Sequence, residues 1–308
     1  MSKFYYKVYG LIIESEIILS ELVEVNKREN DNIGMKVDVF IRQCEMPKTI
    51  KKSIETGIIS DFNINECWFI IKDIGIYRMI NGNEIFVEDI CDNFKEIKAF
   101  LLGSAFGCIL IQRNLVSIHG STILIKDKGV IITGHMGAGK STLTAAFRAK
   151  GYKFLADDIS VTHMDENNKI RVNPAYPQQK LCRDAAIKLG LDVNDFKFID
   201  EERDKFAIPS KESFIDSTKE LNSICEIFIS QDDNNHVVIE EILGIKKVER
   251  IICNIYRCSI AKTIGIKGIY FRNLIKMAEQ IKYYKIIRPK GLFTMDEQMN
   301  LIISTINV

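Results

Sequence analysis

Residues 134–141 read GHMGAGKS, in which Gly134, Gly139, Lys140 and Ser141 match the pattern G-x-x-x-x-G-K-[ST]. Glycines allow backbone N–H groups to turn toward phosphate oxygens, and a lysine at this spacing can reach the terminal phosphates of a nucleotide. The hydroxyl group of Ser141 is suited to bind Mg²⁺. The pattern therefore predicts a loop that binds nucleotide phosphates. The alternative is a glycine-rich turn that matches by chance.

Backbone groups rather than side chains make most of the contacts in such a loop. The variable positions, among them His135, are therefore expected to contribute main-chain contacts. The residues that we expect to contact the nucleotide are Gly134, His135, Met136, Gly137, Ala138, Gly139, Lys140, Ser141 and Thr142.

Two adjacent carboxylates, Asp157 and Asp158, end the run YKFLADD downstream of the loop. A carboxylate beside a phosphate loop can hold Mg²⁺ or accept the proton of an attacking hydroxyl group. The pair follows an apolar run, at the C-terminal end of a strand, which is where open α/β sheets bind their ligands. The structural alternative is a turn or helix cap that uses acidic residues.

A third candidate, His119, lies in the run SIHGS, fifteen residues before Gly134. A lone histidine most often has a structural role, and spacing alone assigns no chemistry to it. Any role for His119 must come from information beyond its position in the chain.

The segments around the loop predict the elements that such a motif needs. The residues from Val130 to Thr133 are apolar and predict a strand that leads into the loop. The run STLTAAFRAKG predicts a helix that ends at Gly151, a common position for a C-terminal glycine. The run YKFLA predicts another strand, and SIHGSTILI followed by KDKG and VIIT predicts a hairpin before the loop. A strand, a glycine loop, a helix and a strand in this order favour the phosphate-binding interpretation.

The chain divides into two predicted domains. Residues 1–93 contain short β-branched and aromatic runs separated by turn formers such as NGNE, and they contain no visible chemical motif. We predict a small β-rich N-terminal domain here, which packs against the rest or presents substrate to it. Residues 94–308 contain the loop and predict an α/β catalytic domain.

Composition excludes several classes of partner. The chain has 308 residues and a net charge of +1, which gives no electrostatic case for a nucleic-acid or acidic-membrane partner. The longest central apolar stretch, AFLLGSAFGCILIQ, is too short to cross a bilayer and predicts a buried helix. The eight cysteines lack the spacing of a zinc site and are expected to be reduced thiols, so we predict a cytoplasmic protein.

The run FLLGSAFGCILIQRNLVSIHGSTILIKDKGVIITGHMGAGKSTLTAAFRAKGYKFLADDIS resembles the catalytic domain of HPr kinase/phosphorylase and its smaller relatives. In that family a His-Gly pair precedes the hairpin that leads into the loop, and an Ala-Asp-Asp strand end follows the loop helix. The resemblance is clear over about residues 94–180. It implies a P-loop nucleotide-binding core like that of phosphoenolpyruvate carboxykinase, with a mixed sheet.

The resemblance also implies roles for individual residues. Asp157 would be the general base that takes the proton of a serine hydroxyl group, and Asp158 would support the Mg²⁺ site together with Ser141. His119 would orient Asp157 beside the transferred phosphoryl group, while Lys140 would bind the β- and γ-phosphates. ATP and Mg²⁺ are the implied cofactors, and the ring assemblies common in the family make a homo-oligomer a further possibility.

Two departures from the family pattern bear on the substrate. Full-length HPr kinases usually carry a glutamate after the Lys-Ser of the loop, where this chain has Thr142, and no segment resembles their second signature. The segment NPAYPQQKLCRDAA instead fits short HPr-kinase-like proteins found with ribosomal peptide pathways. These include kinases that phosphorylate a serine of lasso-peptide precursors.

A cation beyond the loop is needed to offset charge on the transferring phosphoryl group. The basic candidates are Lys180, Arg183, Arg203 and Lys205. The run RDKFAIP resembles a basic segment of the short relatives, so Arg203 and Lys205 are the preferred phosphate or substrate contacts. A solvated charged loop is the alternative.

The leading functional hypothesis is an ATP- and Mg²⁺-dependent kinase that phosphorylates a serine hydroxyl group of a peptide or small protein. A lasso-type ribosomal precursor peptide is the acceptor that we favour. One alternative is a true HPr serine kinase. Another is a nucleotide-binding regulatory module that transfers no phosphoryl group.

Overall fold

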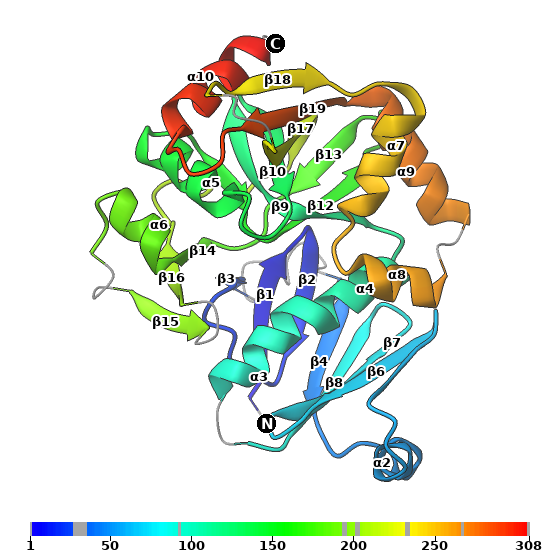
Figure 1. The fold of residues 1–308 in the computed structure, drawn as a ribbon. Helices are drawn as coiled ribbons and strands as arrows, with labels where there is room; N and C mark the ends of the chain where they lie inside the picture. The colour runs from blue at the N-terminus through cyan, green and yellow to red at the C-terminus, as the bar shows by residue number, and fades with distance from the viewer. Residues whose placement is uncertain are drawn as a thin grey trace. The chain divides into compact units, whose positions relative to one another are not determined.

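The computed structural model describes residues 2–26, 36–91, 94–192, 196–200, 204–231, 235–265 and 268–306. The chain forms two compact units, and Figure 1 shows its path through both. The first unit contains Met1–Ser117 and Arg257–Phe271, and the second contains Ile118–Tyr256 and Arg272–Val308. Each unit is therefore built from two separate parts of the sequence.

The first unit is built on one mixed eight-stranded sheet in the order β3-β1-β2-β4-β8-β7-β6-β5. Its β-branched and aromatic runs form these strands, as the sequence predicted for residues 1–93. The strands are β1 (Phe4–Val8), β2 (Leu11–Ser15), β3 (Val23–Glu24), β4 (Val39–Gln43), β5 (Ser60–Phe62), β6 (Glu66–Ile71), β7 (Gly75–Ile80) and β8 (Glu84–Asp89). The helices are α2 (Lys48–Glu55), α3 (Phe94–Phe100), the π-helical turn η2 (Leu101–Ala105), α4 (Phe106–Gln112) and α8 (Cys258–Ile264).

The boundary between the units differs from the predicted one after residue 93. The helical segment from α3 to α4 lies in the first unit because it is fastened to that sheet. The hydroxyl group of Tyr77 donates a hydrogen bond to the carbonyl oxygen of Ile97 (3.1 Å), and the backbone N–H of Gly82 donates to the side chain of Gln112 (2.8 Å). Burial of the apolar residues along α4 matches the helix that the sequence predicted there.

The second unit is built on a mixed sheet in the order β10-β9-β12-β13-β17-β19-β18. Strand β10 also runs parallel to β17, and β17 runs parallel to β19. The strands are β9 (Val116–Ile125), β10 (Lys128–Gly134), β11 (Phe154–Ala156), β12 (Ile159–Met164), β13 (Ile170–Asn173), β17 (Lys219–Ile229), β18 (Val238–Glu241) and β19 (Lys282–Arg288). The helices are α5 (Lys140–Ala149), α7 (Gly244–Cys253), α9 (Gly268–Gln280), whose first residues belong to the first unit, and α10 (Met295–Thr305).

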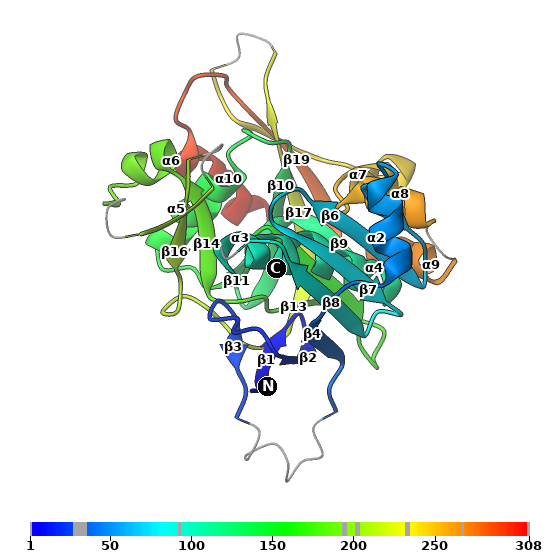
Figure 2. The same cartoon turned by 90° about the horizontal axis from the view of Figure 1, so that it is seen from below.

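A three-stranded sheet, β14-β16-β15, completes the second unit. Its elements are β14 (Gln178–Cys182), α6 (Arg183–Lys188), β15 (Lys197–Asp200) and β16 (Lys205–Pro209). Leu181 and Phe206 pack with Ala145 of α5, and Figure 2 shows β14 and β16 beside that helix. This packing brings Lys180 of β14 and Lys205 of β16 toward the start of α5.

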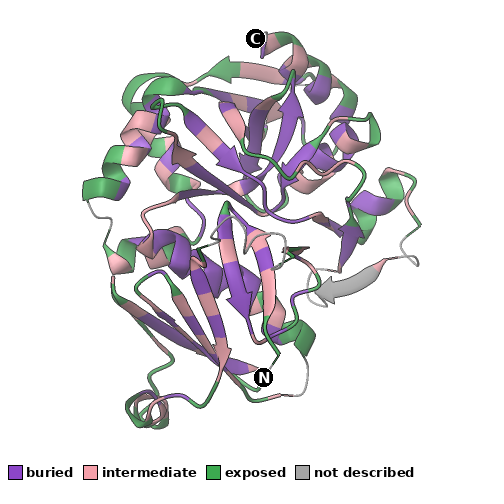
Figure 3. Cartoon of the chain, turned by 180° about the vertical axis from the view of Figure 1, so that it is seen from behind, coloured by how far each residue is buried: buried purple, intermediate pink, exposed green. Residues whose placement is uncertain are grey.

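The core of the second unit lies where α5 and α10 pack on the sheet. Ile132, Ile227 and Ile286 from three adjacent strands are buried with Phe147 of α5 and Met299 of α10. Figure 3 shows buried residues, in purple, along the strands of both sheets. The strand, loop and helix around residue 134 therefore sit on a rigid apolar base. Among the described residues, no helix combines the length and apolar character needed to cross a membrane.

Candidate functional site

The glycine-rich loop joins β10 to the first turn of α5, as the sequence predicted. Gly134 has a φ of 143° and Gly139 a φ of 105°, which lie in the region of backbone space that favours glycine. A methyl group on Gly134 would also lie 2.6 Å from the carbonyl oxygen of Ile227. Both glycines are therefore required by the conformation of the loop. Ala138 is buried in the core beneath α5, while His135 and Met136 are exposed.

Lys140 is the first residue of α5, and its ammonium group is held over the loop. It donates hydrogen bonds to the carbonyl oxygens of Gly134 (2.7 Å) and His135 (3.1 Å). Burial lowers the pKa of Lys140, and the positive charge of Lys205 lowers it further, against the opposing effect of Asp158. A cation that is already partly desolvated interacts strongly with an anion that enters the same space.

Asp157 is buried, and both of its carboxylate oxygens accept hydrogen bonds from the protein. The hydroxyl group of Ser121 donates to Oδ1 (2.6 Å), and the backbone N–H of Lys180 donates to Oδ2 (2.8 Å). Burial raises the pKa of this carboxyl group, and the nearby charge of Asp158 raises it further. Asp157 thus links β9, the end of β11 and the start of β14.

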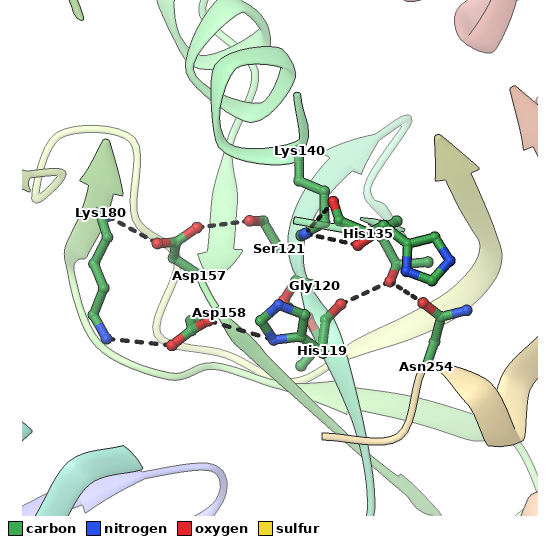
Figure 4. A network of polar contacts seen from close by, with 12 residues as sticks. His119, Gly120, Ser121, His135, Lys140, Asp157, Asp158, Lys180 and Asn254 are labelled. Carbon is green, nitrogen blue, oxygen red and sulfur yellow. Dashed lines mark hydrogen bonds and ion pairs between the residues drawn. The ribbon is translucent and has the colours of Figure 1, made fainter. Parts of the chain in front are cut away.

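Asp158 lies in a different environment from its neighbour. Its Oδ1 is 3.4 Å from Nδ1 of His119, and its Oδ2 is 3.2 Å from Nζ of Lys180. Its backbone has a φ of 65°, in the left-handed region that aspartate tolerates better than most residues. Figure 4 shows Lys180 and His119 on opposite sides of the Asp158 side chain, which is 29% exposed.

The charges around Asp158 determine its protonation. Burial alone would raise the pKa of Asp158, but the positive charges of Lys180 and Lys205, together with His119, lower it to about 2. In return, the Asp158 carboxylate raises the pKa of Lys180 above its ordinary value and outweighs the lowering effect of burial. At neutral pH the site therefore holds an ionised carboxylate next to an ammonium group.

This pairing makes stability depend on pH, which a Lys180→Met variant should reveal. The pKa of Asp158 is lower in the folded state (about 2) than in an unfolded chain (~3.9), so its ion pairing stabilises the protein above about pH 4 and is lost as pH falls toward 2. The destabilisation of Lys180→Met relative to wild type should grow as pH rises from about 2, and it should level off only above the pKa that Asp158 has in the variant, which burial raises once the lysine is gone. Urea unfolding at a series of pH values measures it. A Lys188→Met variant at the end of α6 is the control, and an identical pH dependence in both variants would contradict the pairing.

The four basic residues that the sequence offered as phosphate contacts differ in where the structure places them. Lys205 begins β16 and acts electrostatically on both Asp158 and Lys140, so the structure brings it to the site. Arg203 lies outside the described residues. Arg183 pairs with Asp204 (2.8 Å) at an exposed position, and not with Asp157 or Asp158. Lys180 was one of four basic candidates in the sequence, and its contacts with both aspartates depend on the packing of β14 against α5.

The packing of β14 is maintained by Gln179, which is fully buried. Its side-chain amide donates a hydrogen bond to the carbonyl oxygen of Ser141 (2.9 Å) and accepts one from Arg148 (2.6 Å). The first and last turns of α5 are therefore both tied to the strand that carries Lys180. No local sequence pattern would have identified this glutamine.

His119 is positioned by a polar network that reaches into the core. The backbone N–H of His119 donates to the carbonyl oxygen of Asn254 (2.8 Å). The hydroxyl group of Thr133, just before the loop, lies 2.7 Å from the carbonyl oxygen of His119 and 2.8 Å from Oδ1 of Asn254. Asn254 follows α7, so this residue joins the strand of His119 to the strand that leads into the loop (Figure 4).

The network continues to a buried ion pair. The side-chain amide of Asn254 donates to the hydroxyl group of Tyr283 (3.1 Å), which donates to Glu226 (2.7 Å). Glu226 is 1% exposed and is paired with Arg250 of α7. A buried carboxylate that is fully hydrogen-bonded in this way holds its neighbours in one arrangement. No pattern in the sequence indicates this network, because its members lie far apart in the chain.

Gly120, next to His119, is required by close approach of two strands. A methyl group at this position would lie 2.5 Å from the carbonyl oxygen of Ile132 and 3.0 Å from the side chain of Ile131. We expect Gly120→Ala to lower the free energy of unfolding by about 1–3 kcal/mol, because β9 must move away from β10. Thermal unfolding measures the change. Gly268→Ala is the control, since a methyl group there meets nothing within 4 Å. Equal stability of the two variants would contradict the close approach.

The oxygen ligands near the loop suit a magnesium ion that arrives with a nucleotide. Among the described residues, no group of three or more histidine, cysteine, aspartate or glutamate side chains could hold a metal ion. Mg²⁺ usually takes only one or two protein oxygens and completes its shell with water and phosphate oxygens. The hydroxyl group of Ser141, in the first turn of α5, fits that requirement, whereas Asp158, the other ligand expected from the sequence, is paired with Lys180 and lies close to His119.

Comparison with known proteins gives one sequence match of limited extent. No protein-family model matches the chain. The chain is 38% identical over 66 residues to an HPr kinase/phosphorylase from Lactobacillus acidophilus, a stretch that covers 21% of this chain and 20% of that protein. The match therefore spans about a fifth of the curated relative. This stretch confirms the predicted resemblance to the HPr kinase family.

A solved structure also matches at low similarity. It is described as the HPr(Ser) kinase/phosphatase from Coxiella burnetii, and the match covers 61% of this chain and 89% of that chain. The sequence identity is 17% and the TM-score is 0.32.

Proposed function

We propose that this protein is a kinase that transfers the γ-phosphoryl group of ATP, with Mg²⁺, to a serine hydroxyl group of a peptide or small protein. One observation carries most of the weight. The ionised carboxylate of Asp158 lies between Lys180 and His119, in the same electrostatic environment as Lys140 of the glycine loop. Protein kinases place a carboxylate at the acceptor hydroxyl group and cations around the transferred group, and catalysis is mainly by positioning and charge neutralisation.

We assign the acceptor-facing role to Asp158, whereas the resemblance implied Asp157 as the base and Asp158 as support for the Mg²⁺ site. Asp157 is buried and both of its oxygens accept hydrogen bonds from the protein, so it is less accessible to an acceptor hydroxyl group than Asp158. Asp158 is partly exposed and ionised at neutral pH. An ionised carboxylate can accept a hydrogen bond from the serine hydroxyl group and then its proton. Asp157 holds Ser121 and the backbone of Lys180 in place.

Three lysines supply the positive charge. Lys140 would bind the β- and γ-phosphates. Lys180 and Lys205, which both act on Asp158, would contact the γ-phosphoryl group. Their charges would offset the negative charge on the phosphoryl oxygens as the bond to the β-phosphate breaks. When bound, Mg²⁺ would neutralise phosphate charge, and Ser141 is the side chain that we expect to hold it. His119 would orient Asp158 through the contact between Nδ1 and Oδ1.

A lasso-type ribosomal precursor peptide is the acceptor that we propose. Support comes from Thr142 in the loop and from the segment NPAYPQQKLCRDAA, both of which fit short HPr-kinase-like proteins better than full-length HPr kinases. That segment covers β14 and carries Lys180, so it contributes directly to the site. The 66-residue match favours HPr as a second candidate acceptor.

The test is transfer of radiolabelled γ-phosphate from ATP to precursor peptides and to HPr, measured in parallel with the full chain. Labelling of a serine in the peptide supports the proposed acceptor, whereas labelling of HPr alone favours the second candidate. Nucleotide binding without transfer to either acceptor would contradict the kinase assignment and indicate a regulatory module.

A further inference from the structure

The segment of residues 289–294, which connects β19 to α10, carries two exposed apolar side chains. Leu292 is 48% exposed and Phe293 is 54% exposed. Contact of large apolar side chains with water is unfavourable in free energy. Exposed apolar side chains that lie next to one another often mark a binding surface. The roles proposed above for the loop and the aspartates make no use of these residues.

This segment is hydrogen-bonded to the glycine loop at one end and lies near the loop at the other. Nε of Arg288 donates a hydrogen bond to the carbonyl oxygen of Ala138 (2.8 Å), and Nη1 donates to the carbonyl oxygen of Pro289 (3.1 Å). At the other end, Met295 is buried, and its methyl group lies 3.9 Å from the position of a Cβ on Gly139. Figure 1 shows this connection running from β19 to α10 near the start of α5. Leu292 and Phe293 are therefore tethered beside the residues that would bind phosphates.

A nucleotide bound by its phosphates must place its base on a surface next to the loop, because the ribose links the two parts covalently. The base needs an apolar or aromatic surface, since stacking on an aromatic face is favourable for any base. Leu292 and Phe293 provide such side chains, in a segment that is hydrogen-bonded to the loop through Arg288 and lies near it at Met295.

We propose that Leu292 and Phe293 form the binding surface for the purine base of the nucleotide. The loop holds the phosphates, and Phe293 packs against the face of the base. Arg288 positions the segment by its bond to the loop and makes no contact with the base. This base site rests on the proposed function, because it requires the loop to bind nucleotide phosphates.

Two ligands separate base recognition from phosphate recognition. Inorganic triphosphate with Mg²⁺ can occupy the loop but has no base, whereas ATP with Mg²⁺ has both. We expect Phe293→Ala in the full chain to weaken ATP binding about tenfold while leaving triphosphate binding unchanged. Phe293→Trp should retain ATP affinity, and its fluorescence should be quenched by ATP but not by triphosphate. Leu243→Ala is the matched control, because Leu243 is also a large exposed apolar residue of the second unit.

Each alternative outcome has a definite meaning. Equal weakening of both ligands in Phe293→Ala would overturn the base site, as would unchanged binding of both. A change in oligomeric state by light scattering, with the ratio of the two affinities unaltered, would identify the segment as a contact between copies of the chain and would also overturn it. If wild type bound neither ligand, the proposed nucleotide-binding function itself would fail.

Discussion

An Asp158→Asn variant is expected to transfer phosphoryl groups about 10²–10⁴-fold more slowly than wild type. The substitution keeps the size of the side chain but removes the negative charge and the ability to accept the proton of the serine hydroxyl group. It also leaves the ammonium group of Lys180 without its carboxylate partner. The loss should appear in kcat, measured at saturating ATP and acceptor.

The neighbouring carboxylate, Asp157, provides the control for this result. An amide in its place would fit the existing contacts, because it can accept a hydrogen bond from the backbone N–H of Lys180 and donate one to the hydroxyl oxygen of Ser121. We therefore expect Asp157→Asn to lower kcat only a few-fold, an order of magnitude or more less than Asp158→Asn. If Asp157→Asn were inactive and Asp158→Asn active, with both variants folded, Asp157 would be the base.

Magnesium dependence separates the two functions that Asp158 could have. If Asp158 serves the acceptor, the Mg²⁺ concentration that gives half-maximal activity should be the same in Asp158→Asn as in wild type. A large increase in that concentration, with kcat restored by excess Mg²⁺, would show that Asp158 acts as a metal ligand.

A Lys140→Met variant is expected to lower kcat by about 10²–10³-fold. The ammonium group of Lys140 is desolvated and held over the loop, where it faces the charge that develops during transfer. Methionine preserves most of the length of the side chain but provides no charge. Burial of this cation costs free energy that its two hydrogen bonds to the loop carbonyl groups only partly offset, so we expect the variant to be about as stable as wild type.

Lys150→Met is the matched control for this result, because Lys150 follows the last turn of the same helix. Its ammonium group is exposed and pairs with Asp296 at the surface, so it contributes little to stability and nothing to the site. Steady-state rates and thermal unfolding should be measured for both variants. A loss of activity in Lys140→Met that is fully explained by unfolding would contradict a catalytic role for the ammonium group.

The sequence alone predicted the local part of the candidate site. The strand, loop and helix around residues 134–141 could be predicted because the glycine spacing and the helix periodicity are patterns of residues close together in the chain. The same applies to the hairpin before the loop, where Lys126 and Asp127 adopt the positive φ values of a tight two-residue turn. The aspartate pair was identified by its residue types and its position at a strand end, whereas His119 was identified only by the resemblance to a known family.

The division of roles between Asp157 and Asp158 required the tertiary structure. Adjacent carboxylates are equivalent in sequence, but the fold buries one against Ser121 and places the other between Lys180 and His119. Burial and neighbouring charge then move their pKa values in opposite directions. Such differences depend on segments that meet only after folding.

The sequence by itself determined a glycine loop between a strand and a helix, a hairpin that carries His119, and a pair of aspartates at a strand end. These features depend on interactions between residues close together in the chain. Only the tertiary structure decided which aspartate is exposed, which lysine pairs with it, and that Asn254 and Arg288 hold the strand and the loop in place. Those contacts join residues more than twenty, and in some cases more than a hundred, positions apart. They arise from packing of whole elements, which no local pattern encodes.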